Sequence, residues 1–307
     1  MLLATAAPMH AQPTAWEDHS TGEAHLWAVQ FADDEFGVAT GSASTILLYD
    51  GSQWRADDDN PWRAAGVADA HLRGLAVLDR EEVWVGSYMN QRGYARKDAD
   101  GWSDIMRALS GDRVGALWAL SQNFILSGHN IGRLNRFDGV EWRRVHASER
   151  GGAFFAIDGS GPADVWAAST KGDVVRSIDG GVSFETISVP DALAETSWHG
   201  ASALSESAAW LVGDEGRIAF WNGSALVAQD SGVDVELNDV LAVSADEVYA
   251  VGNGGTVLHY DGESWSTLDL GISVRGQPQA IGRTPAGDLW VVGTHGLMIV
   301  GRAAASP

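Results

Sequence analysis

Short apolar runs separated by tight polar turns recur along the whole chain. The clearest copy, residues 237–268, contains three such runs, the turn Tyr260-Asp261-Gly262 and a further run that carries Trp265. Short runs bounded by glycine and aspartate are typical of β-strands, and no long helical pattern accompanies them. The pattern therefore predicts four strands in each copy.

The second run of each copy contains an apolar triplet that usually ends in glycine. Seven triplets occur, and they begin at Val38, Val83, Ile125, Val165, Trp210, Tyr249 and Trp290. A period of about 40 residues with four strands in each is typical of propeller blades. We therefore expect an all-β fold, a seven-bladed β-propeller built from four-stranded antiparallel blades.

The third and fourth runs are joined by Asp-Gly or Asn-Gly, which closes a two-residue hairpin because both residues tolerate positive φ. Six copies have this turn, at Asp50, Asp100, Asp138, Asp179, Asn222 and Asp261. The last copy stops at Gly301 without one. We expect a strand around Trp16 to complete that blade, because closure of the ring removes the free sheet edge.

The predicted propeller occupies residues 14–302, with tails at 1–13 and 303–307. An aromatic residue recurs on the fourth strands, as Trp16, Trp54, Trp102, Trp142, Phe184 and Trp265, and Leu226 takes the place in the fifth copy. Each large ring buries about 150–250 Å² when it is packed. Most of the 14 tryptophans are therefore interpreted as packing between blades.

Composition narrows the classes of partner. The 307 residues carry 20 basic and 41 acidic side chains, a net charge of −21, so nucleic acids and anionic membranes are disfavoured as partners. Cysteine is absent, which excludes disulfides and thiolate metal sites. No apolar run reaches the roughly 18 residues of a membrane span, and a monomer is the default expectation.

The first residues allow two interpretations. The run Leu2 to Ala7 is similar to the end of an export signal, and Ala11 fits the position before a cleavage point. A basic segment is missing, however, and Met9 stands where a small residue is usual. The alternatives are a periplasmic or secreted protein with a shortened signal and a cytoplasmic protein with a loose tail. We favour the first.

The repeats resemble those of YCF48-like, photosystem II assembly-factor-like propellers and related bacterial propellers. The segment 177–184, Ser-Ile-Asp-Gly-Gly-Val-Ser-Phe, is similar to the Asp box of BNR repeats, S-x-D-x-G-x-[ST]-[WF]. This resemblance implies a seven-bladed propeller in which the Asp box stabilises a turn, and it implies no glycosidase chemistry. Sialidases carry an early Arg-Ile-Pro motif, and the nearest match here, Arg217-Ile218-Ala219, lies elsewhere in the chain.

A ligand site is expected at the channel mouth, the face where the links between blades and the loops between second and third strands emerge. A concave surface with converging polar groups is the usual place for such a site. Candidates at the starts of the innermost strands are His25, His71, Arg113, Phe154, His199, Asn238 and Gln279. The second-to-third loops add Tyr88, Asn90, Arg92, His129, Asp214, Asn253 and His295, and the links add Trp62 and Trp198.

Several of these candidates have alternative interpretations. One interpretation is a shared site for a divalent metal or an acidic sugar, formed by His25, His71 and His199. The other, which we favour, is that each of these histidines forms an ordinary hydrogen bond. We therefore expect no cofactor. Trp62 and Trp198 either stack on a ligand or plug the links beneath the loops. The run Asp57-Asp58-Asp59 lacks the spacing of a calcium loop and is interpreted as a solvated charge run.

No nucleophile elbow, phosphate loop, zinc-protease motif or dinucleotide fingerprint occurs in the sequence. The leading hypothesis is therefore a noncatalytic propeller that binds a protein or a glycan through the channel mouth. The alternative is a carbohydrate-active enzyme, either a polysaccharide lyase or a glycoside hydrolase, that uses histidine, tyrosine and arginine side chains there.

Overall fold

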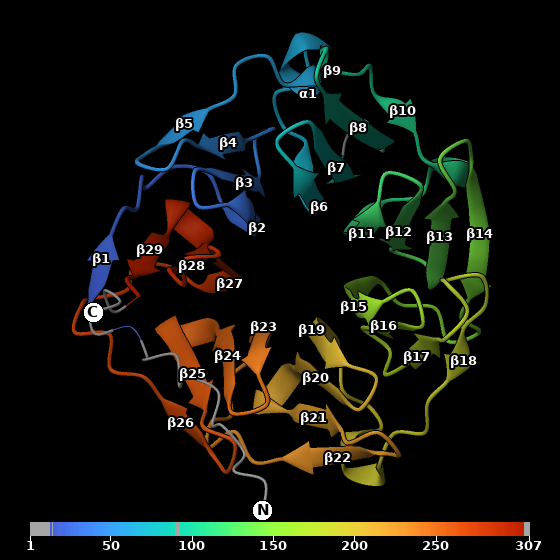
Figure 1. Cartoon of the computed structure of the whole chain (residues 1–307), viewed down its shortest axis with the longest axis vertical. Coiled ribbons are helices and arrows are strands. Elements are labelled where there is room, and N and C mark those ends of the chain that lie inside the picture. The colour runs from blue at the N-terminus through green and yellow to red at the C-terminus, as the bar shows by residue number, and fades with distance from the viewer. Residues whose placement is uncertain (1–12, 14, 90–92, 304–307) are drawn as a thin grey trace, which may run out of the picture.

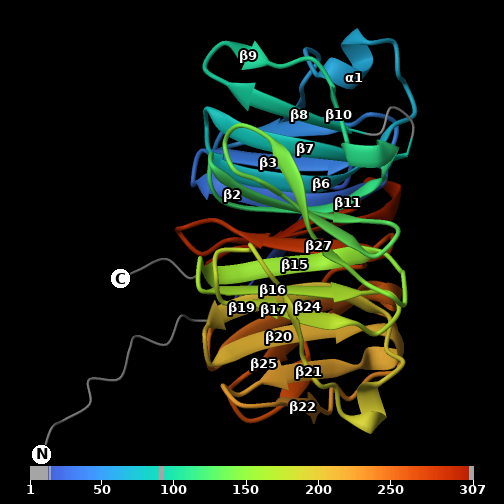
Figure 2. The same cartoon turned by 90° about the vertical axis from the view of Figure 1, so that its right-hand side faces the viewer.

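The computed structural model describes residues 13, 15–89 and 93–303, and it places seven small sheets in a ring (Figure 1). Each sheet is antiparallel with four strands along its main path, so the predicted seven-bladed propeller is confirmed. In Figure 2, where the ring is seen from its side, the strands run across its thickness. No helix in the described part of the chain is long and apolar enough to cross a membrane.

The blades are numbered one to seven from the sheet that begins at β2. From the channel outward, blade one consists of β2 (Leu26–Asp33), β3 (Phe36–Gly41), β4 (Ile46–Tyr49) and β5 (Trp54–Ala56). Blade two consists of β6 (His71–Asp79), β7 (Glu82–Met89) and β8 (Gly93–Asp98), with β9 (Gly101–Trp102) and β10 (Met106–Arg107) both paired to β8. Blade three consists of β11 (Val114–Ser121), β12 (Phe124–His129), β13 (Arg133–Phe137) and β14 (Trp142–Ala147).

In the same order, blade four consists of β15 (Phe154–Gly161), β16 (Asp164–Ser169), β17 (Val174–Ser177) and β18 (Glu185–Thr186), and blade five of β19 (Trp198–Ser205), β20 (Ala208–Gly213), β21 (Ile218–Trp221) and β22 (Leu226–Gln229). Blade six consists of β23 (Leu237–Ser244), β24 (Glu247–Gly252), β25 (Thr256–Tyr260) and β26 (Trp265–Thr267). Blade seven consists of β27 (Pro278–Arg283), β28 (Leu289–Gly293), β29 (Met298–Gly301) and β1 (Trp16–Asp18). Short helical turns are α1 (Pro61–Ala64), η1 (Leu109–Gly111), η2 (Asp191–Leu193), η3 (Asp214–Gly216), η4 (Asn253–Gly255) and η5 (Thr294–Gly296).

The side chains of the predicted Asp-Gly and Asn-Gly turns hold those hairpins closed. In blade six, Oδ1 of Asp261 accepts hydrogen bonds from the backbone N–H groups of Glu263 (2.9 Å) and Ser264 (2.8 Å). The Asp179 carboxylate of blade four accepts hydrogen bonds from Ser177, Val182 and Ser183, and those from Ser183 are the main reason that its pKa is lowered to about 2. These turns specify where each third strand ends and the fourth begins.

The ring is closed by pairing the two ends of the described chain. Strand β1 lies antiparallel to β29, with Trp16 opposite Gly301, as expected from the sequence. In Figure 1 the blue β1 lies beside the red β29. The Arg302 guanidinium adds ion pairs to Glu17 (3.1 Å) and Asp288 (2.7 Å). A Cβ on Gly301 would lie 2.9 Å from the Trp16 ring, so this pairing needs glycine.

The aromatic rings of the fourth strands pack against the preceding blade, as predicted. Trp142 of blade three stacks on Tyr94 of blade two, with centroids 4.3 Å apart. Trp54 of blade one lies edge-on to Trp290 of blade seven at 5.5 Å. In blade five the ring that packs against the preceding blade is Trp221 of the third strand, and its centroid lies 5.1 Å from that of Trp166 in blade four. Aromatic pairs across blade boundaries therefore form much of the core.

Side chains also cover the inner edges of the innermost strands, whose backbone groups have no further strand to pair with. Gln30 of blade one accepts a hydrogen bond from the N–H of Val77 in blade two (2.9 Å). Asp158 bridges blades four and five by accepting from Ala203 N–H (2.8 Å). Asp239 bridges blades six and seven by accepting from Ile281 N–H (3.0 Å). These bridges satisfy buried donors that strand pairing leaves open.

Trp265→Ala tests the packing between blades. The Trp265 side chain is 8% exposed, and its indole N–H donates to Gln229 Oε1 at 2.9 Å. We expect the substitution to lower the free energy of unfolding in urea by about 3–5 kcal/mol, because a large buried ring is replaced by a cavity. Ser266→Ala on the exposed side of the same strand is the control. A loss below about 1 kcal/mol for Trp265→Ala would contradict the packing.

Candidate binding site at the channel mouth

The central channel holds a cavity of about 360 Å³. In each blade, one residue of the innermost strand pairs with the end of the second strand, for example Leu26 with Gly41 and Trp198 with Gly213. The residue that follows points into the cavity. These seven residues, called the inner ring here, are Trp27, Arg73, Gly115, Phe155, His199, Asn238 and Gln279.

The sequence prediction placed only part of the inner ring correctly. His199, Asn238 and Gln279 do line the cavity. The candidates His25, His71 and Arg113 instead lie two residues before the inner-ring position of their blades, outside the cavity lining. Phe154 is fully buried in its blade, one residue before Phe155. Aligning the innermost strands by the residue with which they pair near the end of each second strand (Gly41, Ser87 and Ser169), rather than by the links of variable length, identifies Trp27, Arg73 and Phe155.

Arg73 is the main cation of the inner ring. Its guanidinium carbon lies 4.4 Å from the centroid of the Phe155 ring, 4.9 Å from that of Trp27 and 5.8 Å from that of Tyr88. Among the described residues, no carboxylate forms an ion pair with Arg73 and no acceptor takes a hydrogen bond from its side chain. Burial lowers the pKa of the guanidinium, against the opposing influence of Tyr88 and Glu236. The geometry is that of a cation–π contact with unused N–H donors.

Gly115 makes room for this arrangement. It occupies the inner-ring position of blade three, and a Cβ there would lie 2.8 Å from the Phe155 ring. Tyr88 lies beside Phe155 at 5.4 Å and also contacts the predicted candidate Arg113, whose guanidinium carbon is 5.6 Å from the Tyr88 centroid. One side of the channel mouth therefore combines two arginines with three aromatic rings.

The histidine candidates do not form one group. His25 and His71 both lie near Trp27, with ring centroids 5.6 Å and 6.4 Å from that of Trp27. The ring of His295 lies beside that of His25, with centroids 5.3 Å apart. His199 instead meets Asp214 and Glu236. The structure thus separates His199 from the two histidines with which it was grouped.

Other candidates are buried and serve packing. Trp62 and Trp198 are both 0% exposed, so they are buried, and Trp198 lies at the start of β19 instead of in a link. His129 is also 0% exposed, as the last residue of β12, and burial lowers its pKa to about 4. Its Nε2 lies 2.8 Å from Asn135 Nδ2 and 3.1 Å from the Tyr94 hydroxyl. A neutral imidazole enclosed in this way is out of reach of a ligand at the mouth.

Two further candidates form hydrogen bonds within the fold. Asn238 is 9% exposed and donates to the carbonyl of Pro278 (2.7 Å), so it ties blade six to blade seven as well as lining the cavity. The run at 57–59 is only partly solvated, because Asp57 accepts a hydrogen bond from the Trp102 indole at 2.8 Å. Arg92 and Asn90 lie outside the described residues.

Two carboxyls deeper in the channel have raised pKa values. Burial raises the pKa of Asp158 to about 6 and that of Asp239 to about 7, and the Asp158 charge adds to the second shift. Both side chains line the cavity and keep part of their surface in contact with water. They also form the bridges between blades described above, which explains why acidic groups are retained at this depth.

Asp239→Asn tests this burial. The carboxyl has a higher pKa in the folded than in the unfolded protein, where it is about 3.9, so wild-type stability falls as the pH rises from about 4 to about 7. Asparagine cannot ionise and can still accept from Ile281 N–H. We expect the variant to gain on the order of 1–3 kcal/mol over wild type at pH 8, with little gain at pH 4.

The measurement is the free energy of unfolding against pH. Asp58→Asn removes the same charge at an exposed position and controls for the general repulsion in an acidic protein. An equal gain for both variants at pH 8, or a gain for Asp239→Asn that does not depend on pH, would show that Asp239 carries no buried charge.

Comparisons with known proteins agree with the fold. No protein-family model matches the sequence, and no curated protein does either. A solved structure described as YCF48 bound to D1 peptide is similar, with a TM-score of 0.74 and 18% identity over 97% of this chain and 100% of that one. YCF48 from Cyanidioschyzon merolae is similar with a TM-score of 0.76 and 16% identity, over 94% of this chain and 99% of that one. A streptogramin B lyase is similar with a TM-score of 0.67 and 13% identity, over 94% of this chain and 97% of that one. Likeness at such low identity establishes the propeller fold alone.

Proposed function

We propose that this protein is a noncatalytic propeller whose channel mouth binds a peptide segment of a partner protein. The observation that carries the proposal is Arg73, an arginine held between aromatic rings in the central cavity without a carboxylate partner among the described residues. In a chain with 41 acidic side chains, an arginine that lines the central cavity beside aromatic rings without an ion pair can bind an external anion.

A carboxylate is the anion that fits best. The planar guanidinium matches a carboxylate with two parallel N–H···O hydrogen bonds, and its carbon lies close to the ring centroids of Trp27 (4.9 Å) and Phe155 (4.4 Å). The rings also offer apolar surface to the residues next to that carboxylate, as aromatic side chains do in binding hot spots. We therefore propose a peptide with one acidic side chain or a free C-terminus beside apolar residues.

The fold comparison supports a peptide over a glycan. A propeller of similar fold, YCF48, has a solved structure with a bound D1 peptide. The net charge of −21 adds a constraint, because a strongly acidic partner is repelled by the rest of the surface. A segment with a single carboxylate avoids most of that repulsion. The monomeric state and a periplasmic or secreted location belong to the same proposal.

Arg73→Gln tests the site. We expect binding of eight-residue peptides with one carboxylate to weaken at least tenfold, because loss of a charged, largely desolvated hydrogen-bond partner costs more than about 1.4 kcal/mol. Isothermal titration against a peptide library and its amidated counterparts is the measurement. Arg143→Gln removes the same charge from an exposed position on β14 and is the control. Equal affinity for Arg73→Gln and wild type would refute this function.

The enzyme alternative has one specific observation in its favour. Tyr88, Arg113 and the cavity residue His199 combine at one mouth the side chains that a polysaccharide lyase or glycoside hydrolase would use. A screen of acidic and neutral polysaccharides separates the two functions. Turnover that disappears in His199→Ala, with unchanged thermal unfolding, would replace the binding proposal.

A further inference from the structure

We propose that His199, Asp214 and Glu236 form a binding site for one divalent transition-metal ion at the channel mouth. The site uses none of the arginine and aromatic side chains that we assign to peptide binding, although His199 lines the same cavity. Among the described residues, these three are the one group of histidine and carboxylate side chains whose ligand atoms come together closely enough, all within 4.8 Å of one another.

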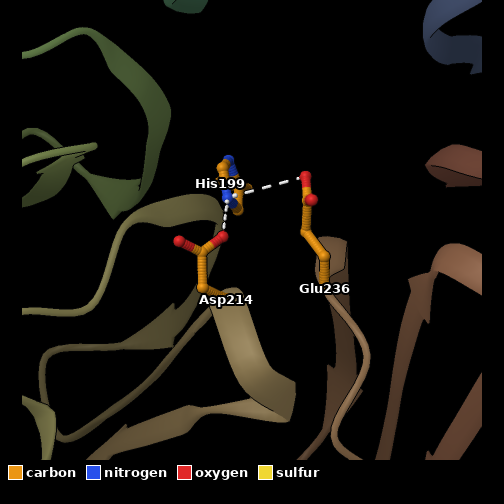
Figure 3. A group of neighbouring side chains, drawn as sticks. All are labelled: His199, Asp214 and Glu236. Carbon is orange, nitrogen blue, oxygen red and sulfur yellow. Dashed lines mark hydrogen bonds and ion pairs between the residues drawn. The ribbon is translucent and has the colours of Figure 1, made fainter.

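The three residues come from separate segments of two neighbouring blades. His199 is the inner-ring residue of β19 in blade five, and Asp214 opens the turn η3 after the second strand of the same blade. Glu236 precedes β23, the innermost strand of blade six. Figure 3 shows the imidazole beside both carboxylates, which reach it from the two blades. The site therefore depends on the packing of blade five against blade six.

The distances suit a metal ion of the size of zinc or manganese. His199 Nε2 lies 2.7 Å from Asp214 Oδ1 and 3.7 Å from Glu236 Oε1. Ligand atoms held about 2.1 Å from a shared ion lie roughly 3.0–3.5 Å apart. The Glu236 contact is already close to that range, and the Asp214 contact needs to open by less than an ångström. Binding would exchange one imidazole–carboxylate hydrogen bond for three metal–ligand bonds.

Hydrogen bonds behind Glu236 orient it for this role. Its second oxygen, Oε2, accepts from Asn253 Nδ2 at 3.3 Å, and the Asn253 Oδ1 in turn accepts from Asn238 Nδ2 at 3.2 Å. Asn238 also donates to the Pro278 carbonyl at 2.7 Å. Outer partners of this kind fix the direction of a ligating carboxylate and contribute to metal affinity. Glu236 thus presents Oε1 to the site from a fixed position.

The composition of the site predicts the class of ion. One imidazole nitrogen with two carboxylate oxygens suits zinc, cobalt, manganese or iron better than calcium or magnesium, which prefer oxygen ligands alone. The Asp214 and Glu236 side chains are 46% and 42% exposed, and His199 lines the central cavity. Three protein ligands at an open surface leave coordination positions for water or for an external ligand.

The experiment is a titration of the full chain, first freed of metal with a chelator, with Zn²⁺ and separately with Mn²⁺ at physiological salt. We expect one saturable equivalent that stands above the weak binding of exposed carboxylates. His199→Ala, Asp214→Asn and Glu236→Gln should each weaken it at least tenfold. Zinc should also raise the unfolding temperature of wild type, because an ion that binds only the folded state stabilises it.

His19→Ala is the matched control. His19 Nε2 lies 3.3 Å from Glu17 Oε2, so it is a histidine paired with one carboxylate, outside the group of three. This variant should keep the full wild-type affinity. Unchanged unfolding temperatures of the metal-free variants would show that they fold. Two results would overturn the proposal: no saturable equivalent in wild type, or the same affinity in wild type and in Glu236→Gln.

Discussion

Pairing of the first described strand with the last is the interaction on which the whole structure depends. Each blade buries its faces only against its two neighbours, so an open chain of seven would leave two blade faces and a sheet edge in water. Residues Trp16 to Asp18 prevent this by completing blade seven from the opposite end of the sequence. The close approach at Gly301 and the ion pairs of Arg302 hold the junction.

Closure of the ring also determines what the channel can do. The seven innermost strands present their inner edges to the centre, and side chains such as Gln30, Asp158 and Asp239 bridge from one edge to the next. Those positions serve the fold, and the raised pKa values of the two aspartates reflect the cost of placing carboxyls there. Arg73 of the inner ring forms no such bridge, and we propose that it binds a ligand instead.

The sequence predicted the scaffold well, because the scaffold repeats. The Asp-Gly turns, the triplets near 40-residue spacing and the tryptophans of the outer strands mark local geometry that each copy needs, and Trp16 was identifiable as the missing strand. The site was predicted less well because it lies where copies differ. In blades one and two the predicted position lies two residues too early, so the prediction named His25 and His71 where Trp27 and Arg73 line the cavity. No local pattern in the sequence reveals that Trp62 and Trp198 are buried. The grouping of Asp214 and Glu236 with His199 depends on contact between blades, which a single sequence does not contain.

We propose that the arginine and aromatic rings at the channel mouth form the binding site of this propeller. Hydrogen–deuterium exchange of the protein alone, compared with the protein saturated with its tightest acidic peptide, locates that site. We expect slower exchange confined to the starts of β2, β6, β11 and β15, where Trp27, Arg73, Gly115 and Phe155 lie. Protection on the outer strands or on the opposite face, with none at these four strand starts, would contradict this binding site.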